Sequence, residues 1–500
     1  MKTSISTLAE LKASGYKPRT IKDELRSNLI AKIQADESVF AGIWGYQDTV
    51  IPDIERAILA KHSINLLGLR GQAKTRIARM MVSLLDEYIP VVKDSPLNDD
   101  PLNPISRFAK DLIAEHGDNT PIGWMHRDER YTEKLATPDV TIADLIGDVD
   151  PIKAASLKLP YSDERVIHYG LIPRSHRGIF VINELPDLQA RIQVALFNVL
   201  QESDIQIRGF KLRLPLDVQF VFTANPEDYT NRGSIITPLK DRIDSQILTH
   251  YPKSIEIGRK ITEQEANLEP EQEKVIVFDL AKNLVEQIAF EARESEYIDK
   301  NSGVSARLTI SAYENLISAA ERRLLRSKEK NTHVRISDFL GIIPAITGKV
   351  ELVYEGEQEG AGIVAHSLVG KAIRTQFLEY FPDPEETRKY KGKPNPYQPM
   401  IDWFGKGNMV DFLNDFTEKE YAKELNNIPG LRDLVESKHK KSEEPFKLFL
   451  MEFALHGLVE FSMLSKHRLE RGLQFKDLLS SMLPFPDPDE DEDFYDSGRN

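Results

Sequence analysis

Between residues 44 and 251 the chain alternates short apolar runs with longer stretches of helical spacing. Four of the runs are rich in Ile, Val or Phe and bounded by turn residues, as buried parallel strands are. The predicted strands are residues 64–67, 178–182, 218–223 and 245–251. Because helical stretches separate these strands, the pattern predicts an α/β fold in which helices cover both faces of an open parallel sheet.

Two segments interrupt this alternation. Residues 101–173 form a long polar stretch that is rich in turn-forming residues. Residues 203–216 alternate apolar and polar positions around Arg208 and Gly209, which predicts a β-hairpin. The hairpin follows the helical run 188–200, so we expect it to interrupt or end that helix.

The rest of the chain is mainly helical in pattern. Residues 271–346 contain three helical runs and predict an all-helical domain. Beyond them we expect helices at 364–381, 409–418, 431–436 and 446–471, a Pro- and Lys-rich linker at 382–399, and a disordered acidic run at 486–493. The expected divisions are a helical lead-in (1–35), an α/β core (36–252), a helical domain (253–350), a helical C-terminal extension (351–485) and an acidic tail (486–500).

Composition and charge narrow the function. With 500 residues, of which 41% are hydrophobic and 29% charged, the sequence is typical of a globular protein with several domains. Its apolar runs are shorter than the ~18 to 20 residues of a membrane span, and no secretory signal is visible at its N-terminus. The absence of cysteine excludes thiolate metal sites and is consistent with a cytoplasmic protein. A net charge of −14 disfavours nucleic acid as a partner.

Residues 68–75 read G-L-R-G-Q-A-K-T and follow the first predicted strand. A strand, the pattern G-x-x-x-x-G-K-[ST] and a helix together form a phosphate-binding loop. Its N–H groups cradle the phosphates, its lysine reaches the outer phosphates and its hydroxyl binds Mg²⁺. Gly68, Lys74 and Thr75 match this pattern, but Ala73 replaces the second glycine. The sequence therefore predicts that the chain binds a nucleoside triphosphate, with a cost of roughly 1–2 kcal/mol if Ala73 must adopt a positive φ.

Polar residues end the next two predicted strands. Asn183 and Glu184 follow one of them, and Asn225 follows the other. Because the carboxyl ends of parallel strands meet at one edge of a sheet, we expect these side chains near Lys74. Glu184 could deprotonate an attacking water that Asn225 holds near the γ-phosphate. Asn183 replaces the aspartate that usually binds Mg²⁺ at this position, so a reduced metal affinity is expected.

Six motifs, in this order, resemble those of AAA+ ATPases of the magnesium-chelatase I-subunit and MoxR branch. They are Gly45-Tyr46-Gln47, the segments 145–150 and 170–178, Ala224-Asn225-Pro226-Glu227-Asp228, Pro238-Leu239-Lys240-Asp241-Arg242-Ile243 and Gly303-Val304-Ser305-Ala306-Arg307. The predicted hairpin is similar to the helix-2 insertion of this branch. The resemblance covers about residues 39–346 and implies an AAA+ phosphate-loop core of three αβα layers followed by a helical lid domain.

The resemblance also implies roles for single residues. Glu184 would be the catalytic base and Asn225 the first sensor of the γ-phosphate. Arg242 would be an arginine finger that completes a neighbouring subunit's site, and Arg307 a second sensor that reaches from the lid. The residues expected to bind ATP are Gln47, Gly68, Gly71, Gln72, Ala73, Lys74, Thr75 and Arg76, and those expected to hold Mg²⁺ are Thr75 and Asn183.

Together these features predict an ATPase that forms a homo-oligomeric ring, expected to be a hexamer, and remodels or assembles a partner protein. In this branch the partner is often a protein with a von Willebrand A domain. Three alternatives remain: a scaffold that binds ATP without hydrolysing it, which Ala73 and Asn183 favour; a magnesium-chelatase motor subunit; and a DNA-binding regulator, which the net charge disfavours. For Arg242 the alternative role is a structural ion pair with Asp241 or Asp244.

Overall fold

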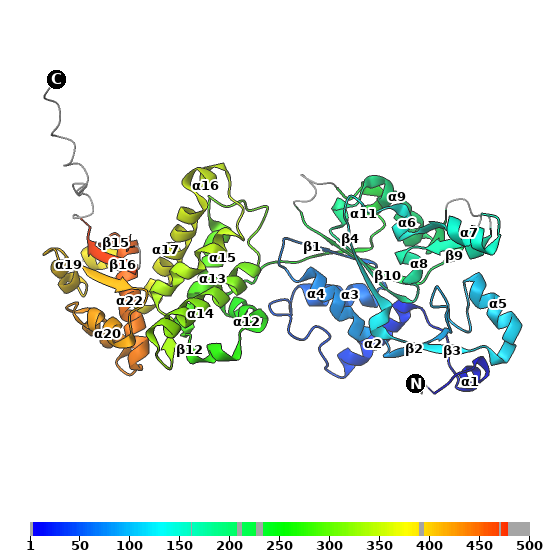
Figure 1. The fold of residues 1–500 in the computed structure, drawn as a ribbon, viewed down its shortest axis with the longest axis horizontal. Helices are drawn as coiled ribbons and strands as arrows, with labels where there is room; N and C mark the ends of the chain where they lie inside the picture. The colour runs from blue at the N-terminus through cyan, green and yellow to red at the C-terminus, as the bar shows by residue number, and fades with distance from the viewer. Residues whose placement is uncertain are drawn as a thin grey trace, which may run out of the picture. The chain divides into compact units, whose positions relative to one another are not determined.

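The computed structural model describes residues 4–161, 163–207, 213–226, 234–389, 395–469 and 472–478. The chain divides into two compact units, Met1–Pro252 and Lys253–Asn500 (Figure 1). Among the described residues, no helix is both long and apolar enough to cross a membrane. The acidic run 486–493 and the predicted hairpin tip at Arg208 and Gly209 lie outside the described residues.

A parallel sheet of five strands forms the centre of the first unit. Its strand order is β11 (Ser245–Leu248), β1 (Ile64–Leu67), β10 (Val218–Ala224), β7 (Gly178–Asn183) and β4 (Tyr131–Leu135). Every neighbouring pair is parallel. All the strands predicted from the sequence are present. Leu67 lies opposite Ala224, so β1 and β10 end side by side at the same edge of the sheet.

Helices cover both faces of this sheet. Along β7, Ile179 and Val181 pack into one hydrophobic cluster, whereas Phe180 and Ile182 pack into another. The first cluster includes α2 (Ile21–Gln34), α3 (Val50–Leu59) and α4 (Lys74–Met80), and the second includes α8 (Leu171–Arg174), α9 (Ala190–Gln201) and α11 (Thr237–Lys240). This alternation is the period of a strand buried on both faces. The predicted α/β class with three layers is confirmed.

The polar stretch 101–173 contains a strand of the main sheet that the sequence pattern did not predict. β4 reads Y-T-E-K-L and pairs with β7 at the edge of the sheet. Edge strands carry polar side chains more often than central ones, so β4 lacks the apolar signal of its neighbours. The other helices and strands of the first unit are α1 (Leu8–Ala13), β2 (Tyr88–Val92), α5 (Arg107–His116), β3 (Ile122–His126), α6 (Ile142–Leu145), β5 (Gly147–Val149), α7 (Pro151–Leu157) and β6 (Ile167–Tyr169).

The predicted hairpin is confirmed in the residues that the structure describes. β8 (Asp204–Gln206) pairs antiparallel with β9 (Arg213–Pro215), shortly after α9 ends. Ile205 and Leu214 lie opposite each other and are buried in the same cluster as α9. The base of the hairpin is therefore packed onto the helical layer.

A buried ion pair joins α2 to the start of β4. Glu24 accepts two hydrogen bonds from Arg130, at 2.7 and 2.6 Å, and each residue is only 3% exposed. Glu24 also accepts the backbone N–H of Asp86, and Arg130 donates to the carbonyl of Arg177. Helix α2 is thus fixed to the core of the first unit by both packing and charge.

The second unit has one hydrophobic core, which extends from Val275 to Phe475. Its longest helices are α13 (Asp279–Glu294), α14 (Arg307–Ser327), α17 (Ala361–Tyr380) and α22 (Glu444–Glu460). An antiparallel sheet has the order β14 (Val410–Leu413), β16 (Gly472–Asp477) and β15 (Leu464–Leu469). The remaining elements are α12 (Ile255–Glu265), β12 (Val275–Ile276), β13 (Thr332–His333), the 3₁₀ helix η7 (Ile336–Ile342), α15 (Ile343–Thr347), α16 (Tyr354–Glu359), α18 (Pro384–Lys389), α19 (Gln398–Phe404), α20 (Glu418–Asn426) and α21 (Leu431–His439).

Three sequence-based predictions in this unit are wrong. Residues 409–418 contain strand β14 instead of a helix, and its buried positions alternate at Val410 and Phe412. The stretch 446–471 is helical only to the end of α22 and then forms β15. The stretch 382–399, predicted as a linker, contains α18 and the start of α19. Short apolar runs do not distinguish strand from helix by period alone.

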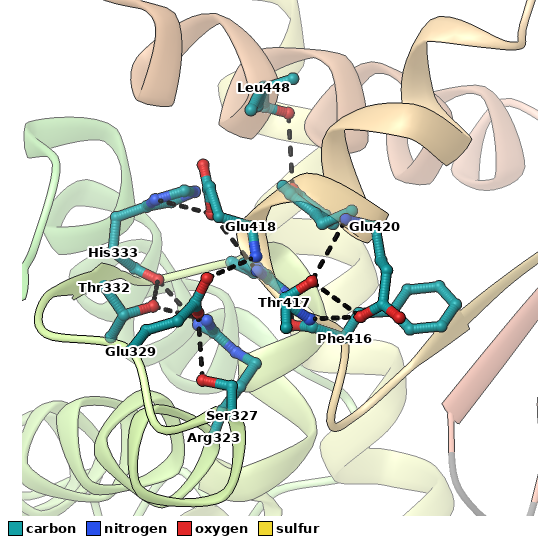
Figure 2. A network of polar contacts seen from close by, with 12 residues as sticks. Arg323, Ser327, Glu329, Thr332, His333, Phe416, Thr417, Glu418, Glu420 and Leu448 are labelled. Atoms are coloured by element: carbon teal, nitrogen blue, oxygen red, sulfur yellow. Dashed lines mark hydrogen bonds and ion pairs between the residues drawn. The ribbon is translucent and has the colours of Figure 1, made fainter.

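A polar network connects the parts of the second unit that precede and follow residue 350 (Figure 2). Arg323 of α14 donates to the Thr332 hydroxyl at 2.6 Å and to the carbonyl of His333 at 2.7 Å. The His333 ring lies 3.5 Å from the carboxylate of Glu418, at the start of α20. The backbone N–H of Glu418 donates to Glu329 at 3.0 Å. These contacts place α20 against the end of α14.

A second group of contacts lies deeper in the same unit. Glu452 of α22 is fully buried and accepts hydrogen bonds from the Tyr421 hydroxyl at 2.8 Å and from the backbone N–H of Ile336 at 2.7 Å. The guanidinium of Arg335 lies over the Tyr421 ring, 4.0 Å from its centroid. Buried polar groups that are satisfied in this way hold their elements in one arrangement.

The Glu286→Gln substitution is expected to stabilise the second unit at pH 8. Glu286 of α13 is 3% exposed, accepts a hydrogen bond from Thr262, and has its pKa raised to about 7 by burial, from 4.5. Between these values the folded state binds more protons than the unfolded state, so stability falls as pH rises. Glutamine removes the buried charge, and we expect a gain of up to about 3 kcal/mol.

This gain should be measured as the difference between the two proteins in urea unfolding at pH 5 and pH 8. It should be small at pH 5, where the folded wild-type carboxyl is mostly protonated. A difference that does not change with pH would show that Glu286 is not the titrating group.

Candidate functional site

The phosphate loop connects β1 to α4 at the carboxyl edge of the sheet. Gly71 and Ala73 both have positive φ angles, 72° and 57°, and Lys74 begins the helix. A Cβ on Gly68 would lie 2.0 Å from the Thr249 hydroxyl and 2.2 Å from Gln72 Oε1, so only glycine fits there. The loop thus has the turn that its sequence pattern predicted, with alanine in a conformation that favours glycine.

The Ala73→Gly substitution is therefore expected to stabilise the protein. The left-handed conformation costs an alanine roughly 1–2 kcal/mol, and the greater freedom of glycine in the unfolded chain offsets part of this gain. We expect a net increase of about 1 kcal/mol in the free energy of unfolding, measured by urea titration. The matched control is Ala78→Gly inside α4, which should lower stability by about 1 kcal/mol or more. If Ala73→Gly lowered the free energy of unfolding, it would contradict the inference that the backbone at Ala73 is strained.

Lys74 contacts the end of the neighbouring strand. Its ammonium group donates to Asn225 Oδ1 at 2.7 Å, to the carbonyl of Leu69 at 2.9 Å and to the carbonyl of Gly68. The backbone N–H of Gly68 donates to Ala224, which precedes Asn225. The expected meeting of Lys74 and Asn225 at one sheet edge is present in the structure.

Asn183 lies between the phosphate loop and β10. Its Oδ1 accepts hydrogen bonds from the hydroxyls of Thr75 at 3.4 Å and Thr223 at 3.1 Å. The next residue, Glu184, has a positive φ of 56°, and its backbone N–H donates to the Thr223 hydroxyl. The structure therefore brings together Thr75 and Asn183, the two residues expected to hold Mg²⁺, and Glu184 directly follows Asn183 in the sequence.

Sequence reasoning missed an acidic residue next to Asn183. Glu133 of β4 forms two hydrogen bonds with Arg79 of α4, each 2.9 Å long. These bonds, with others from Tyr131 and Asn183, hold the pKa of Glu133 below its usual value. Because β4 had no strand signal, nothing in the sequence placed this carboxylate at the site.

The end of β11 supports the other side of the loop. Thr249 donates to Gln72 Oε1 at 2.6 Å, and the Tyr251 hydroxyl donates to the carbonyl of Arg70 at 2.9 Å. The Tyr46 hydroxyl donates to the Gln72 carbonyl at 3.1 Å, and burial raises the pKa of Tyr46 to about 12. These contacts hold the loop backbone in place.

Three further predicted residues are Arg76, Gln47 and Arg307. Arg76 is in the first turn of α4, and the exposed Gln47 donates to the Ile43 carbonyl at 2.7 Å. Arg307 is the exposed first residue of α14, in the second unit.

Arg242 is half-buried and held by its own chain. It donates to Gln201 at 3.0 Å and to the carbonyl of Pro238 at 2.7 Å, and it lies 4.7 Å from the centroid of the Phe197 ring. Within the described residues it forms no ion pair with Asp241 or Asp244. The guanidinium thus lies over the end of α9.

The residues at the carboxyl edge of the sheet are of the kinds that bind a nucleotide and its Mg²⁺. The loop offers two turn residues with positive φ, Gly71 and Ala73, followed by a lysine and a helix N-terminus, which together favour phosphate. Thr75 and Asn183 offer oxygen ligands of the kind Mg²⁺ binds. Across the part of the chain that the structure describes, no group of three or more His, Asp or Glu side chains could hold a metal ion by itself.

Comparisons with known proteins found one family model and several solved structures to which the chain is similar. A protein-family model described as the Sigma-54 interaction domain matches residues 160–246. Among solved structures, NtrX from Brucella abortus is 14% identical, with a TM-score of 0.36, over 74% of this chain and 70% of that one. The Thermotoga maritima RuvB Holliday junction branch migration motor is 13% identical, with a TM-score of 0.31, over 65% and 68%. A magnesium-chelatase complex of subunits BchI and BchD is 18% identical, with a TM-score of 0.31, over 61% and 95%.

The family match falls within the first unit and spans β7, β10 and the start of β11. It therefore covers the strands that carry Asn183, Glu184 and Asn225. Over these strands the chain is similar to the Sigma-54 interaction domain, and its five-stranded parallel sheet with a phosphate loop is an α/β fold.

Proposed function

We propose that this chain binds ATP with Mg²⁺ and hydrolyses it, in a ring of identical subunits. The observation that carries the proposal is the contact between Lys74 and Asn225, because it joins the phosphate loop to the end of the adjacent strand. Lys74 would hold the outer phosphates, and Thr75 with Asn183 would hold the metal. When bound, Mg²⁺ would neutralise phosphate charge.

The attack on the γ-phosphate would be arranged by two residues at the strand ends. Glu184 would take the proton from the attacking water, and Asn225 would position that water. Phosphoryl transfer depends mostly on positioning and on charge stabilisation. Arg242 would supply a further positive charge to the site of a neighbouring subunit, after leaving its contacts with Gln201 and Phe197. Arg307 would act from the lid as a second sensor.

The Lys74→Ala substitution tests nucleotide binding. We expect the affinity for a fluorescent ATP analogue with Mg²⁺ to fall by about 10- to 100-fold, because hydrogen bonds to charged groups contribute roughly 1.5–3 kcal/mol. The control is Lys110→Ala on α5, since Lys110 is exposed. Equal affinities for the wild type and Lys74→Ala would reject the proposed site.

A scaffold that binds ATP without turnover is the second candidate. Two observations favour it: the strained backbone at Ala73 and the amide of Asn183 in place of a carboxylate. Phosphate release separates the two functions, since a scaffold would retain tight nucleotide binding but release phosphate only at the background rate.

We further propose that the ring belongs to the MoxR and magnesium-chelatase branch and acts in the cytoplasm on a partner protein, such as one with a von Willebrand A domain. The motif order in residues 39–346 supports this assignment, and the motor subunit of a magnesium chelatase remains an alternative. Affinity capture with the ATP-bound protein, followed by mass spectrometry, would test the partner. If no protein with a von Willebrand A domain is captured, the proposal of such a partner is rejected.

A further inference from the structure

The second unit contains a cavity of about 390 Å³ that lies far along the chain from the nucleotide loop. Side chains from η7, α15, α17 and β16 form its apolar wall, including Phe339, Ile343, Val369, Ile373 and Leu473. Cavities of this volume with a mainly apolar lining and a few polar groups are typical of small-molecule sites.

The polar part of the lining is basic. Lys466 and Arg468 of β15 line the cavity together with His366 of α17 and His456 of α22. Lys466 lies 3.5 Å from Glu460, whereas the guanidinium of the exposed Arg468 forms no ion pair with any described residue. The site thus combines an apolar wall with an excess of positive charge.

His456 is the most informative of these groups. It is 4% exposed, and among the described residues neither ring nitrogen has a hydrogen-bond partner. Its nearest acid is Glu452, with Nε2 at 3.9 Å from Oε1, which is too long for a hydrogen bond. A buried polar group without a partner is costly, so a ligand that presents a polar atom to this ring would remove that cost.

The two histidines are neutral at pH 7. Burial, together with the charge of Lys466, holds the pKa of His456 well below its usual value. Burial, with the charges of Arg468 and Lys466, lowers the pKa of His366. Each neutral ring can donate one hydrogen bond, and an oxygen anion would accept it.

We propose that this cavity binds a small aliphatic monocarboxylate. Its hydrocarbon chain would lie against the apolar wall, and its carboxylate would lie between Lys466, Arg468 and the ring of His456. A cationic ligand would be repelled by the two basic side chains, and a neutral alcohol would lack the charge that strengthens hydrogen bonds from Lys466 and Arg468. The proposal is independent of nucleotide binding.

The test uses the full chain and decanoate, at concentrations below micelle formation, in isothermal titration calorimetry. We expect saturable binding of one decanoate per chain. Arg468→Gln and Lys466→Gln should each weaken it by about tenfold or more, since each removes a charge-assisted contact. Lys330→Gln, at an exposed lysine outside the cavity lining, is the matched control and should leave the affinity unchanged.

A second measurement locates the ligand. Decanoate should shift the NMR signals of the His456 ring, and decanol and decylammonium should shift them far less at the same concentration. The proposal is overturned if decanoate does not saturate, if decylammonium binds equally well, or if Arg468→Gln binds like the wild type. It is also overturned if saturating decanoate leaves the His456 signals unchanged. In that case, displacement of decanoate by a peptide with a free C-terminal leucine would show that both ligands bind elsewhere.

Discussion

The Glu24→Ala substitution is expected to lower the stability of the first unit by about 3–5 kcal/mol. It would leave the guanidinium of Arg130, which is 3% exposed, without its two hydrogen bonds to a carboxylate. An unpaired charge in a protein interior cannot recover its hydration, so the cost falls on the folded state. The backbone N–H of Asp86 would also lose its acceptor. Urea or thermal unfolding would measure the change.

Two further variants separate charge from packing. Glu115→Ala, at an exposed position of α5, is the matched control and should change stability by less than about 0.5 kcal/mol. Combining Glu24→Leu with Arg130→Met removes both charges, and this double variant should be more stable than Glu24→Ala. If Glu24→Ala unfolds like the wild type, the ion pair does not hold α2 to the core.

The Glu184→Gln substitution is expected to reduce ATP hydrolysis by roughly 10²- to 10⁴-fold while preserving nucleotide binding. Glutamine keeps the size of the side chain but cannot accept the proton of the attacking water. The backbone position should persist, because the N–H of residue 184 donates to the Thr223 hydroxyl in either variant. Steady-state phosphate release and binding of the fluorescent analogue would be measured on the same preparations.

Glu202→Gln, at the exposed C-terminal end of α9, is the control for the loss of a carboxylate outside the site and should hydrolyse ATP at the wild-type rate. If wild type and Glu184→Gln release phosphate equally slowly while both bind ATP, the scaffold function replaces the enzyme. If Glu184→Gln also loses binding, the residue has a structural role at the site.

The central strands were predictable because their burial on both faces leaves a continuous apolar run. Strand β4 was not, since its exposed edge position allows Thr132, Glu133 and Lys134 to be polar. The C-terminal strands β14 and β15 were mistaken for helix because short apolar runs fit both periods. What determines them is their pairing with β16, which is a long-range contact that no local pattern records.

The site was predictable to the extent that it is local in sequence. The loop 68–75 and the residues that end β7 and β10 follow from motif spacing. The backbone conformation of Ala73 could not be predicted, because the sequence was compatible with either helical or left-handed dihedral angles there. The structure shows the left-handed one, with a positive φ. The position of Glu133 beside the site could not be predicted, because it follows from the pairing of β4 with β7 and from no motif in the sequence. The roles of Arg242 and Arg307 rest on resemblance and stay predictions.

The single core of the second unit has a consequence for how the protein can be dissected. A fragment that ends near residue 350 would lose α17, which packs onto α13, and α22, which packs onto α17, and would thus remove much of the shared hydrophobic core. In such a fragment Arg323 would also lose its electrostatic interaction with the Glu418 carboxylate. Residues 253–350 and the residues that follow them therefore form one folded unit, and a fragment of either part alone is expected to be unstable.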